Sequence, residues 1–350
     1  MISFVEYIWL DNGYPTPSLR SKCRTLILPT QPSLDDFPSC SFDGSGTYQA
    51  DVATSDCLLK PIKFCNDPIR GKPHYLLLCE VYTHENQPHA SNHRSRLSQT
   101  LAQYPESQHL WLGFEQEYVF MQSGRPLGYH DSMTPSHPNN PYVCGVNTNT
   151  GRQLVDQHSQ ACLDADLLIF GTDSESMPGQ WEFQIGYRGF KHDRYDALSV
   201  CDDKCLAMWL LHRICEQASS YLTEPITINT DNKPLVDWPG SGCHVHFSTA
   251  LMRDPKKGPM AIQQVIKQLE NRHTHHIIQY GHDNHKRLTG AHCTAPIDTF
   301  ITAPLHREAS IRTPLTTHQK GYGPLEDRRP GANADPYLVT QCLIHTLFGN

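Results

Sequence analysis

Two glutamates stand two positions apart inside an otherwise apolar and aromatic stretch, "LGFEQEYVF", at residues 112–120. Because alternate residues of a strand share a face, Glu115 and Glu117 would point the same way, roughly 7 Å apart. Burying a carboxylate in such a strand costs several kcal/mol unless it is paired or bound to a metal. The stretch therefore predicts either an edge strand that faces water or a strand that binds metal.

Other glutamates and histidines favour the metal-binding interpretation. Glu182 lies in the apolar stretch "QWEFQ", seven residues after Glu175, and Glu326 stands in "PLEDRRPGAN". The stretch "GSGCHVHFS" puts His244 and His246 on one strand face behind a glycine-rich turn. Together these residues predict a deep acidic pocket. Oxygen ligands with one imidazole suit Mg²⁺ or Mn²⁺ better than zinc.

Arginines accompany the carboxylates. Arg307 and Arg312 occur in "HREASIRTP", and Arg328 and Arg329 follow soon after. Guanidinium groups beside metal-bound carboxylates are typical of phosphoryl transfer, where they neutralise charge on the transferred group. A glycosidase would also use paired carboxylates, but it would leave the arginines without a role. The sequence has no GxxxxGK[ST] loop, so we expect metals and arginines to hold a nucleotide.

Composition and charge restrict the class of protein. The 350 residues are 38% hydrophobic and 19% charged, as in a soluble globular protein with one large or two smaller domains. The net charge of −7 without a basic stripe argues against nucleic acid, and no apolar stretch is long enough to span a membrane. Thirteen cysteines without a repeated spacing, and a start, "MISFVEYIWLDNG", unlike a secretory signal, predict a reduced cytoplasmic protein.

The elements that must position these residues predict an α+β protein. Expected strands of a small N-terminal β-rich domain cover 6–11, 23–28, 57–64 and 75–82. A polar segment at 83–97 suits a domain boundary and the start of a helix, and a loop rich in Pro, Asn and His follows at 130–142. In the larger second part, apolar spacing predicts helices over 151–167, 204–222 and 258–280 and strands over 180–188, 242–249 and 309–314.

Several stretches occur together in one recognisable order and spacing: "GFEQEY", "MPGQWEFQIG", "GSGCHVHFS", "NHKRLTG", "ASIRTP" and "EDRRPGANADP", with "FDGSGT" and "CEVY" before them. They resemble the motifs of glutamine synthetases of the eukaryotic type (type II), as in a divergent member of that family. The resemblance implies a β-grasp domain at 1–87 and a catalytic domain at 94–350 that binds ATP and metal. In the catalytic domain, an antiparallel sheet would form an open funnel, as in the glutamine synthetase and guanido kinase-like fold.

The resemblance also implies site residues and partners. One divalent cation (Mg²⁺ or Mn²⁺) would be held by Glu115, His244 and Glu326, and the other by Glu117, Glu175 and Glu182. ATP would contact Trp111, Ser248, Arg253 and Arg312. The acid substrate would contact Gly240, His244, Arg307 and Arg328, and the catalytic residues would be Asp56, Arg307, Arg328 and Cys293. Subunits would form a ring, such as a decamer, in which a neighbouring subunit offers Asp56 to the ammonium ion at each active site.

The reaction that the resemblance implies joins glutamate to ammonia. The γ-phosphoryl group of ATP would first convert the γ-carboxylate into an acyl phosphate, because a carboxylate oxygen leaves badly. Ammonia would then displace phosphate and give glutamine. Metals and arginines would stabilise negative charge in both steps.

Two substitutions relative to the family leave the identity of the amine substrate and of the acid substrate undecided. Cys293, in "LTGAHCT", stands where the family has a glutamate that closes the site and helps take a proton from ammonium; a thiol is shorter and normally uncharged at pH 7. Pro239, in "DWPGSG", stands where the family has an asparagine that helps seat glutamate, and proline removes both the amide and a backbone N–H. The alternatives to glutamine formation are a specialised ligase that uses a weakly basic amine, and a catalytically inactive homologue.

Overall fold

The N-terminal part of the chain forms a five-stranded sheet in the order β2-β1-β5-β4-β3. A computed structural model describes residues 1–131, 133, 135, 145 and 150–349. Strands β1 and β5 run parallel, and the other neighbours in this sheet are antiparallel. The strands are β1 (Ile2–Leu10), β2 (Leu19–Ile27), β3 (Cys40–Asp43), β4 (Asp56–Asn66) and β5 (Tyr75–Tyr82).

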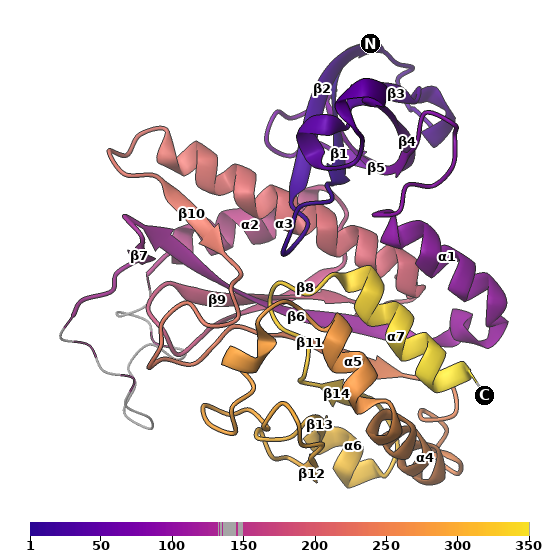
Figure 1. Ribbon diagram of the computed structural model, residues 1–350, viewed down its shortest axis with the longest axis vertical. Helices are drawn as coiled ribbons and strands as arrows, with labels where there is room; N and C mark the ends of the chain where they lie inside the picture. The colour runs from indigo at the N-terminus through magenta and orange to yellow at the C-terminus, as the bar shows by residue number, and fades with distance from the viewer. Residues whose placement is uncertain (132, 134, 136–144, 146–149, 350) are drawn as a thin grey trace.

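Alternation of apolar side chains gives this first sheet two different buried faces. Tyr7 and Leu77 belong to a core of the N-terminal domain itself. Ile8 and Leu76, which neighbour these residues on the same two strands, belong to the main core of the larger C-terminal part. The N-terminal domain is therefore packed directly on the C-terminal part, above helix α3 in Figure 1.

The C-terminal part is built on a nine-stranded sheet, counted within the described residues. Its main path is β12-β13-β14-β11-β6-β9-β8, and β7 and β10 also pair with β6. Neighbours are antiparallel except β12 and β13, which run parallel. The strands are β6 (Trp111–Gln122), β7 (Arg125–Pro126), β8 (Ile169–Ser174), β9 (Gln180–Gly186), β10 (Ile226–Asn229), β11 (Cys243–Ser248), β12 (Thr302–Pro304), β13 (Ile311–Thr313) and β14 (Leu325–Asp327).

Helices cover this sheet. The longest, α3, lies between the sheet and the N-terminal domain and contacts β6, β9 and β10 (Figure 1). None of the helices in the described ranges combines the length and the apolar character that crossing a membrane requires. The helices are α1 (His93–Gln103), α2 (Arg152–Asp164), α3 (Ala197–Ser219), α4 (Gly258–Asn271), α5 (His273–Gln279), α6 (Leu315–Lys320) and α7 (Pro336–Phe348).

Most of the expected elements are present, with corrections at particular places. The helix expected over 258–280 is two helices, because the backbone at Arg272 leaves helical geometry (φ −105°, ψ 8°) between α4 and α5. Helix α3 begins seven residues before the expected start at 204, because the Asp196 side chain caps it by accepting a bond from the Ser199 N–H. The expected loop at 130–142 lies mostly outside the described residues.

Candidate active site

Strand register brings the candidate metal ligands together. In the pairing of β6 with its neighbours, Glu115 lies opposite His244 and Glu117 lies opposite Glu182. In the pairing of β11 with β14, His246 lies opposite Glu326. Directly opposite residues have their side chains on the same face of a sheet. The antiparallel pairing thus turns separate stretches of sequence into one acidic surface.

The first group of ligands surrounds Glu115. Its carboxylate accepts a hydrogen bond from His246 Nε2 (2.8 Å) and lies 3.4 Å from His244 Nδ1. Burial opposes ionisation of Glu115, but its bonds to the two imidazoles outweigh burial and hold its pKa well below the usual range. The possible ligand atoms of Glu115, His246 and Glu326 lie within 4.8 Å of one another.

His244 lies between the two groups of carboxylates. Its Nε2 is 3.8 Å from Glu117, and its Nδ1 is 3.9 Å from Glu326. Burial, together with the nearby Arg328, lowers the pKa of His244 to about 4, so the imidazole is neutral at pH 7. A neutral imidazole is the form that binds a metal. Both histidines of "HVH" are therefore placed to be ligands, whereas the sequence had singled out His244.

The second group consists of Glu117, Glu175 and Glu182, whose possible ligand atoms also lie within 4.8 Å of one another. Burial and the neighbouring carboxylates raise the pKa of each of the three, that of Glu182 to about 8. Such a cluster of acidic groups is costly without a cation. A divalent cation would supply the missing positive charge, so these oxygen ligands fit Mg²⁺ or Mn²⁺.

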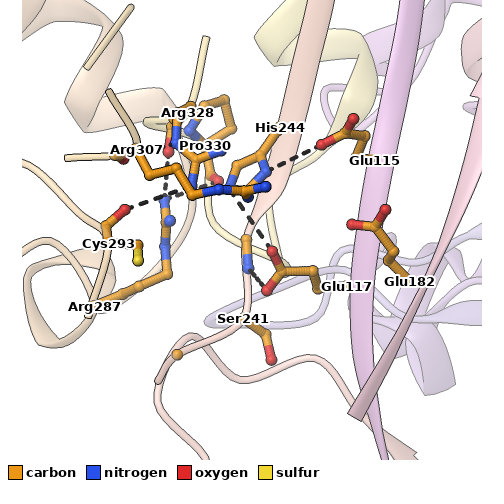
Figure 2. Close-up of polar contacts among 12 residues, drawn as sticks. Glu115, Glu117, Glu182, Ser241, His244, Arg287, Cys293, Arg307, Arg328 and Pro330 are labelled. Carbon is orange, nitrogen blue, oxygen red and sulfur yellow. Dashed lines mark hydrogen bonds and ion pairs between the residues drawn. The ribbon is translucent and has the colours of Figure 1, made fainter. Parts of the chain in front are cut away.

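Arginines lie beside Glu326. Its carboxylate accepts hydrogen bonds from Arg312 Nη1 and Arg328 Nη1, both at 2.5 Å. Arg328 also donates through Nε to the Arg307 carbonyl oxygen (3.0 Å), while the Arg307 side chain is exposed. Figure 2 shows Arg307 and Arg328 on one side of His244 and Glu115 and Glu182 on the other. Positive and negative groups thus face each other across one pocket.

A cavity of about 490 Å³ lies next to this pocket, at the start of β6 and the end of β11. His246, Trp111, Ser248 and Arg253 are among its lining residues. The Arg253 guanidinium lies 3.8 Å from the centre of the Trp111 ring and donates to Ser248 Oγ (3.0 Å). Three of the four residues predicted to contact ATP, Trp111, Ser248 and Arg253, therefore form one aromatic and cationic wall of this cavity. Arg312, the fourth, lies beside Glu326 instead.

The turn that carries Gly240 is tied to the second group of carboxylates. Gln180 Nε2 donates to the Gly240 carbonyl oxygen (3.2 Å) and to Glu117 (3.4 Å). A Cβ on Gly240 would come within 2.2 Å of the Asn232 carbonyl oxygen, so the close packing of this turn requires glycine. Pro239 precedes it and offers no backbone N–H to a substrate.

The loop that carries Cys293 borders the pocket. The Cys293 carbonyl oxygen accepts a bond from Arg328 Nη2 (3.4 Å), and the residue itself is exposed. His292 and Cys293 both have positive φ values, 52° and 62°. One main-chain oxygen of the loop thus contacts the Arg328 side chain.

Asp56 does not join the other candidate residues within one chain. It is the exposed first residue of β4, in the N-terminal domain. That domain lies on the α3 side of the central sheet (Figure 1). The residue between Glu115 and Glu117, Gln116, lines a cavity on the α3 side, so the two glutamates face the opposite side.

Two residues for which the sequence had suggested no role hold the site in place. Arg287, in the motif "NHKRLTG", is buried and donates through Nη2 to three successive carbonyl oxygens, those of residues 328–330. Gln180 links the Gly240 turn to Glu117. A buried arginine satisfied by main-chain oxygens has no sequence signature, because its partners lie about 40 residues away.

Comparison with known proteins covers almost the whole chain. The family model described as "Glutamine synthetase, beta-Grasp domain" matches residues 1–84, and that described as "Glutamine synthetase, catalytic domain" matches residues 91–348. The chain is 40% identical to the chloroplastic glutamine synthetase of Chlamydomonas reinhardtii, over 98% of this chain and 90% of that protein. It is 41% identical to a glutamine synthetase of Streptomyces viridochromogenes, over 97% and 95% of the two chains.

Solved structures share the fold. The alignment with the cryo-EM structure of Plasmodium falciparum glutamine synthetase covers 99% of this chain and 71% of that protein's chain, with a TM-score of 0.75 and 16% sequence identity. The alignment with a structure of GmaS without ligand covers 97% of this chain and 76% of the GmaS chain, with a TM-score of 0.71 and 20% sequence identity. The expected α+β fold, a β-grasp domain followed by the catalytic domain, is confirmed. With family models matching both parts and relatives about 40% identical over nearly its full length, the chain belongs to the glutamine synthetase family.

Proposed function

We propose that the protein is an ATP-dependent ligase that joins the γ-carboxylate of glutamate to ammonia and forms glutamine. The observation that carries this proposal is the pair of ligand groups, around Glu115 and around Glu117, facing Arg307 and Arg328 across one pocket. Carboxylates that can hold cations beside guanidinium groups suit the transfer of a phosphoryl group. Membership of the family supports the same reaction.

The metal-binding residues in this proposal form two sets. Glu115, His244 and Glu326 would hold one Mg²⁺ or Mn²⁺ ion, with His246 as a further possible ligand beside Glu115. The other ion would be held by Glu117, Glu175 and Glu182. The ions would neutralise phosphate oxygens.

The remaining roles are assigned to residues at the pocket and its neighbouring cavity. Nucleotide contacts would be made by Trp111, Ser248, Arg253 and Arg312. The acid would be bound by Gly240, His244, Arg307 and Arg328. Arg307 and Arg328 would also stabilise charge on the phosphoryl group as it moves to the γ-carboxylate. The Cys293 loop would help to keep water from the acyl phosphate.

A second candidate is a specialised ligase that uses glutamate or a related acid with a weakly basic amine. Cys293 favours it, because the loop that contacts Arg328 through the Cys293 carbonyl oxygen carries an exposed thiol there and no carboxylate. Ammonium must lose a proton before it attacks, whereas a weakly basic amine arrives neutral. Pro239, in the Gly240 turn, favours a related acid over glutamate, because proline offers the substrate neither a side-chain amide nor a backbone N–H.

The test is a screen for ADP release with glutamate, ATP and Mg²⁺ or Mn²⁺ against a panel of amines that includes ammonium and the weakly basic hydroxylamine, methoxyamine and aniline. We expect amine-dependent ADP release that stops when the metal is chelated. Release with ammonium supports glutamine formation, and release only with another amine supports the specialised ligase. ATP binding without turnover of any amine would contradict both.

We further propose a homo-oligomeric ring, such as a decamer, with active sites between subunits. Its support is the exposed position of Asp56, on the α3 side of the sheet away from its own chain's carboxylates. We also propose domain boundaries at 1–87 and 94–350 and a cytoplasmic location. The free thiols of the twelve described cysteines suit a reducing compartment.

Mixing two inactive variants tests the shared site. Asp56→Ala and Glu326→Gln subunits should each lack activity, while co-expressed mixtures should regain activity at about a quarter of their sites, where an intact Glu326 meets an intact Asp56 of the neighbour. Native mass spectrometry would establish that the rings are mixed. Mixed rings no more active than either variant alone would contradict the sharing of sites.

A further inference from the structure

A second cavity lies on the other side of the central sheet, between the N-terminal domain and α3, and encloses about 610 Å³. Leu10 and Leu19 line it from β1 and β2, and Lys204 and Trp209 line it from α3. Gln116 of β6 also lines it. Because residues on either side of Gln116 face the carboxylate pocket, strand β6 alone separates the cavity from that pocket at this point.

Lys204 brings an unpaired charge to this cavity. The residue is 4% exposed, and within the described residues its ammonium has no hydrogen bond and no ion pair. Its Nζ lies 5.7 Å from the centre of the Phe114 ring. The two acidic residues before it on α3 do not compensate. Asp202 binds Arg94, and Asp203 binds Lys63 and Arg194.

The carboxylates around the cavity are also engaged elsewhere. Glu6 pairs with Arg70 (2.7 Å), Asp335 pairs with His93 (2.7 Å), and Glu216 pairs with Arg213. Within the described residues, none of these carboxylates forms an ion pair with the Lys204 ammonium. A buried charge without a partner is costly, so a chain that keeps one beside a cavity gains from an anionic ligand there.

Gln116 provides a second unsatisfied group. Its Nε2 donates to the carbonyl oxygens of Glu117 (2.8 Å) and Ala332 (3.0 Å), which fixes the orientation of the amide. Its Oε1 is buried and has no hydrogen-bond partner within the described residues. The β6 wall of the cavity is therefore rigid at Gln116, and the unpaired group that the cavity offers to a ligand is the Lys204 ammonium on α3.

We propose that this cavity binds a small molecule with one carboxylate and an apolar body. The carboxylate pairs with the Lys204 ammonium, and the apolar body packs against Leu10, Leu19 and Met208. One unpaired lysine matches a single negative charge. A phosphate, with nearly two charges, would meet the carboxylates of Glu6 and Glu216 without a second free cation. The inference concerns a site distinct from the proposed ligase site and does not rest on that function.

Isothermal calorimetry and thermal unfolding of the full chain test the proposal, with butyrate as the probe and butyramide and inorganic phosphate as comparisons. Butyrate should bind and raise the unfolding temperature, and butyramide, which lacks the charge, should bind at least tenfold more weakly. Lys204→Met should lose butyrate binding by about tenfold or more, while Lys204→Arg should retain it. The exposed Lys256→Met is the matched control and should bind butyrate as the unchanged protein does.

The remaining controls separate this site from the carboxylate pocket and from misfolding. Lys204→Met keeps a long unbranched side chain and removes the charge, so its unfolding temperature without ligand should equal or exceed that of the unchanged protein. Arg328→Gln, which alters the other pocket, should leave butyrate binding unchanged. Equal butyrate binding by the unchanged protein and Lys204→Met would overturn the proposal, as would tighter binding of phosphate than of butyrate, or no binding of either.

Discussion

Replacing Glu182 with glutamine should remove one metal site and lower the rate of ADP formation by about 10³-fold or more. Glutamine keeps the volume of the side chain, and its amide oxygen can still accept the bond that Gln184 Nε2 now donates to Glu182. The substitution therefore removes a charge and a ligand without opening a cavity. Calorimetry with Mn²⁺ should count one ion fewer per subunit, and ADP release should measure the loss of rate.

The matched control is Glu106→Gln, which removes an exposed carboxylate that belongs to neither ligand group and should change neither quantity. Near-native far-ultraviolet circular dichroism would exclude misfolding of the Glu182→Gln variant. An unchanged number of Mn²⁺ ions would remove Glu182 from the metal site, whatever happened to the rate.

The same variant should be more stable than the unchanged protein when metal is chelated. Burial, followed by Glu115 and Glu175, raises the pKa of Glu182 from its ordinary 4.5 to about 8. An acid whose pKa is higher in the folded state than in the unfolded state lowers the free energy of unfolding as pH rises above its unfolded-state pKa. This loss of stability reaches its full size once the pH exceeds the folded-state pKa. Thermal unfolding with a chelator should therefore separate the two proteins clearly at pH 8 and hardly at pH 4.

The sequence could predict that the two glutamates of β6 share a face of the strand, but not which residues of the neighbouring strands they contact. Two-residue periodicity puts Glu115 and Glu117 on one face of a strand. That Glu117 lies opposite Glu182 and that His246 lies opposite Glu326 depends on the register between strands separated by dozens of residues. For the same reason the sequence could not show that His246 contacts Glu115 as closely as it does.

Helix α3 shows a second limit of prediction from sequence, which concerns buried polar residues. Its apolar residues predict a buried helix, and the structure buries it. The same helix also buries Asp202, Asp203 and Lys204, which a hydrophobic pattern cannot anticipate. The partners of the two aspartates include Arg94 and Lys63, more than 100 residues earlier in the chain, and Lys204 has none within the described residues. Local patterning thus predicts elements, and long-range pairing decides which of their polar residues are satisfied.

Ammonium should be a poor substrate near pH 7 because Cys293 brings no carboxylate to the pocket. Its rate should rise as pH approaches the pKa of ammonium, since free ammonia then needs no base. Hydroxylamine, which is already neutral at pH 7, should react much faster than ammonium there. Measuring glutamine and γ-glutamyl hydroxamate from pH 6.5 to 9 tests this order, and efficient use of ammonium at pH 7 would show that another group accepts the proton.

Cys293→Glu should restore the use of ammonium at pH 7, by about 10²–10⁴-fold, as expected for a positioned general base. The backbone allows the change, because Cys293 already has a φ of 62° and glutamate is no more branched at Cβ than cysteine. Its carbonyl contact with Arg328 involves only the main chain and would remain. Cys23→Glu, at another exposed cysteine, is the control for added charge. If Cys293→Glu left the ratio of the hydroxylamine rate to the ammonium rate unchanged, the amine would be chosen elsewhere in the pocket, and the Gly240 turn with Pro239 would be the next position to alter.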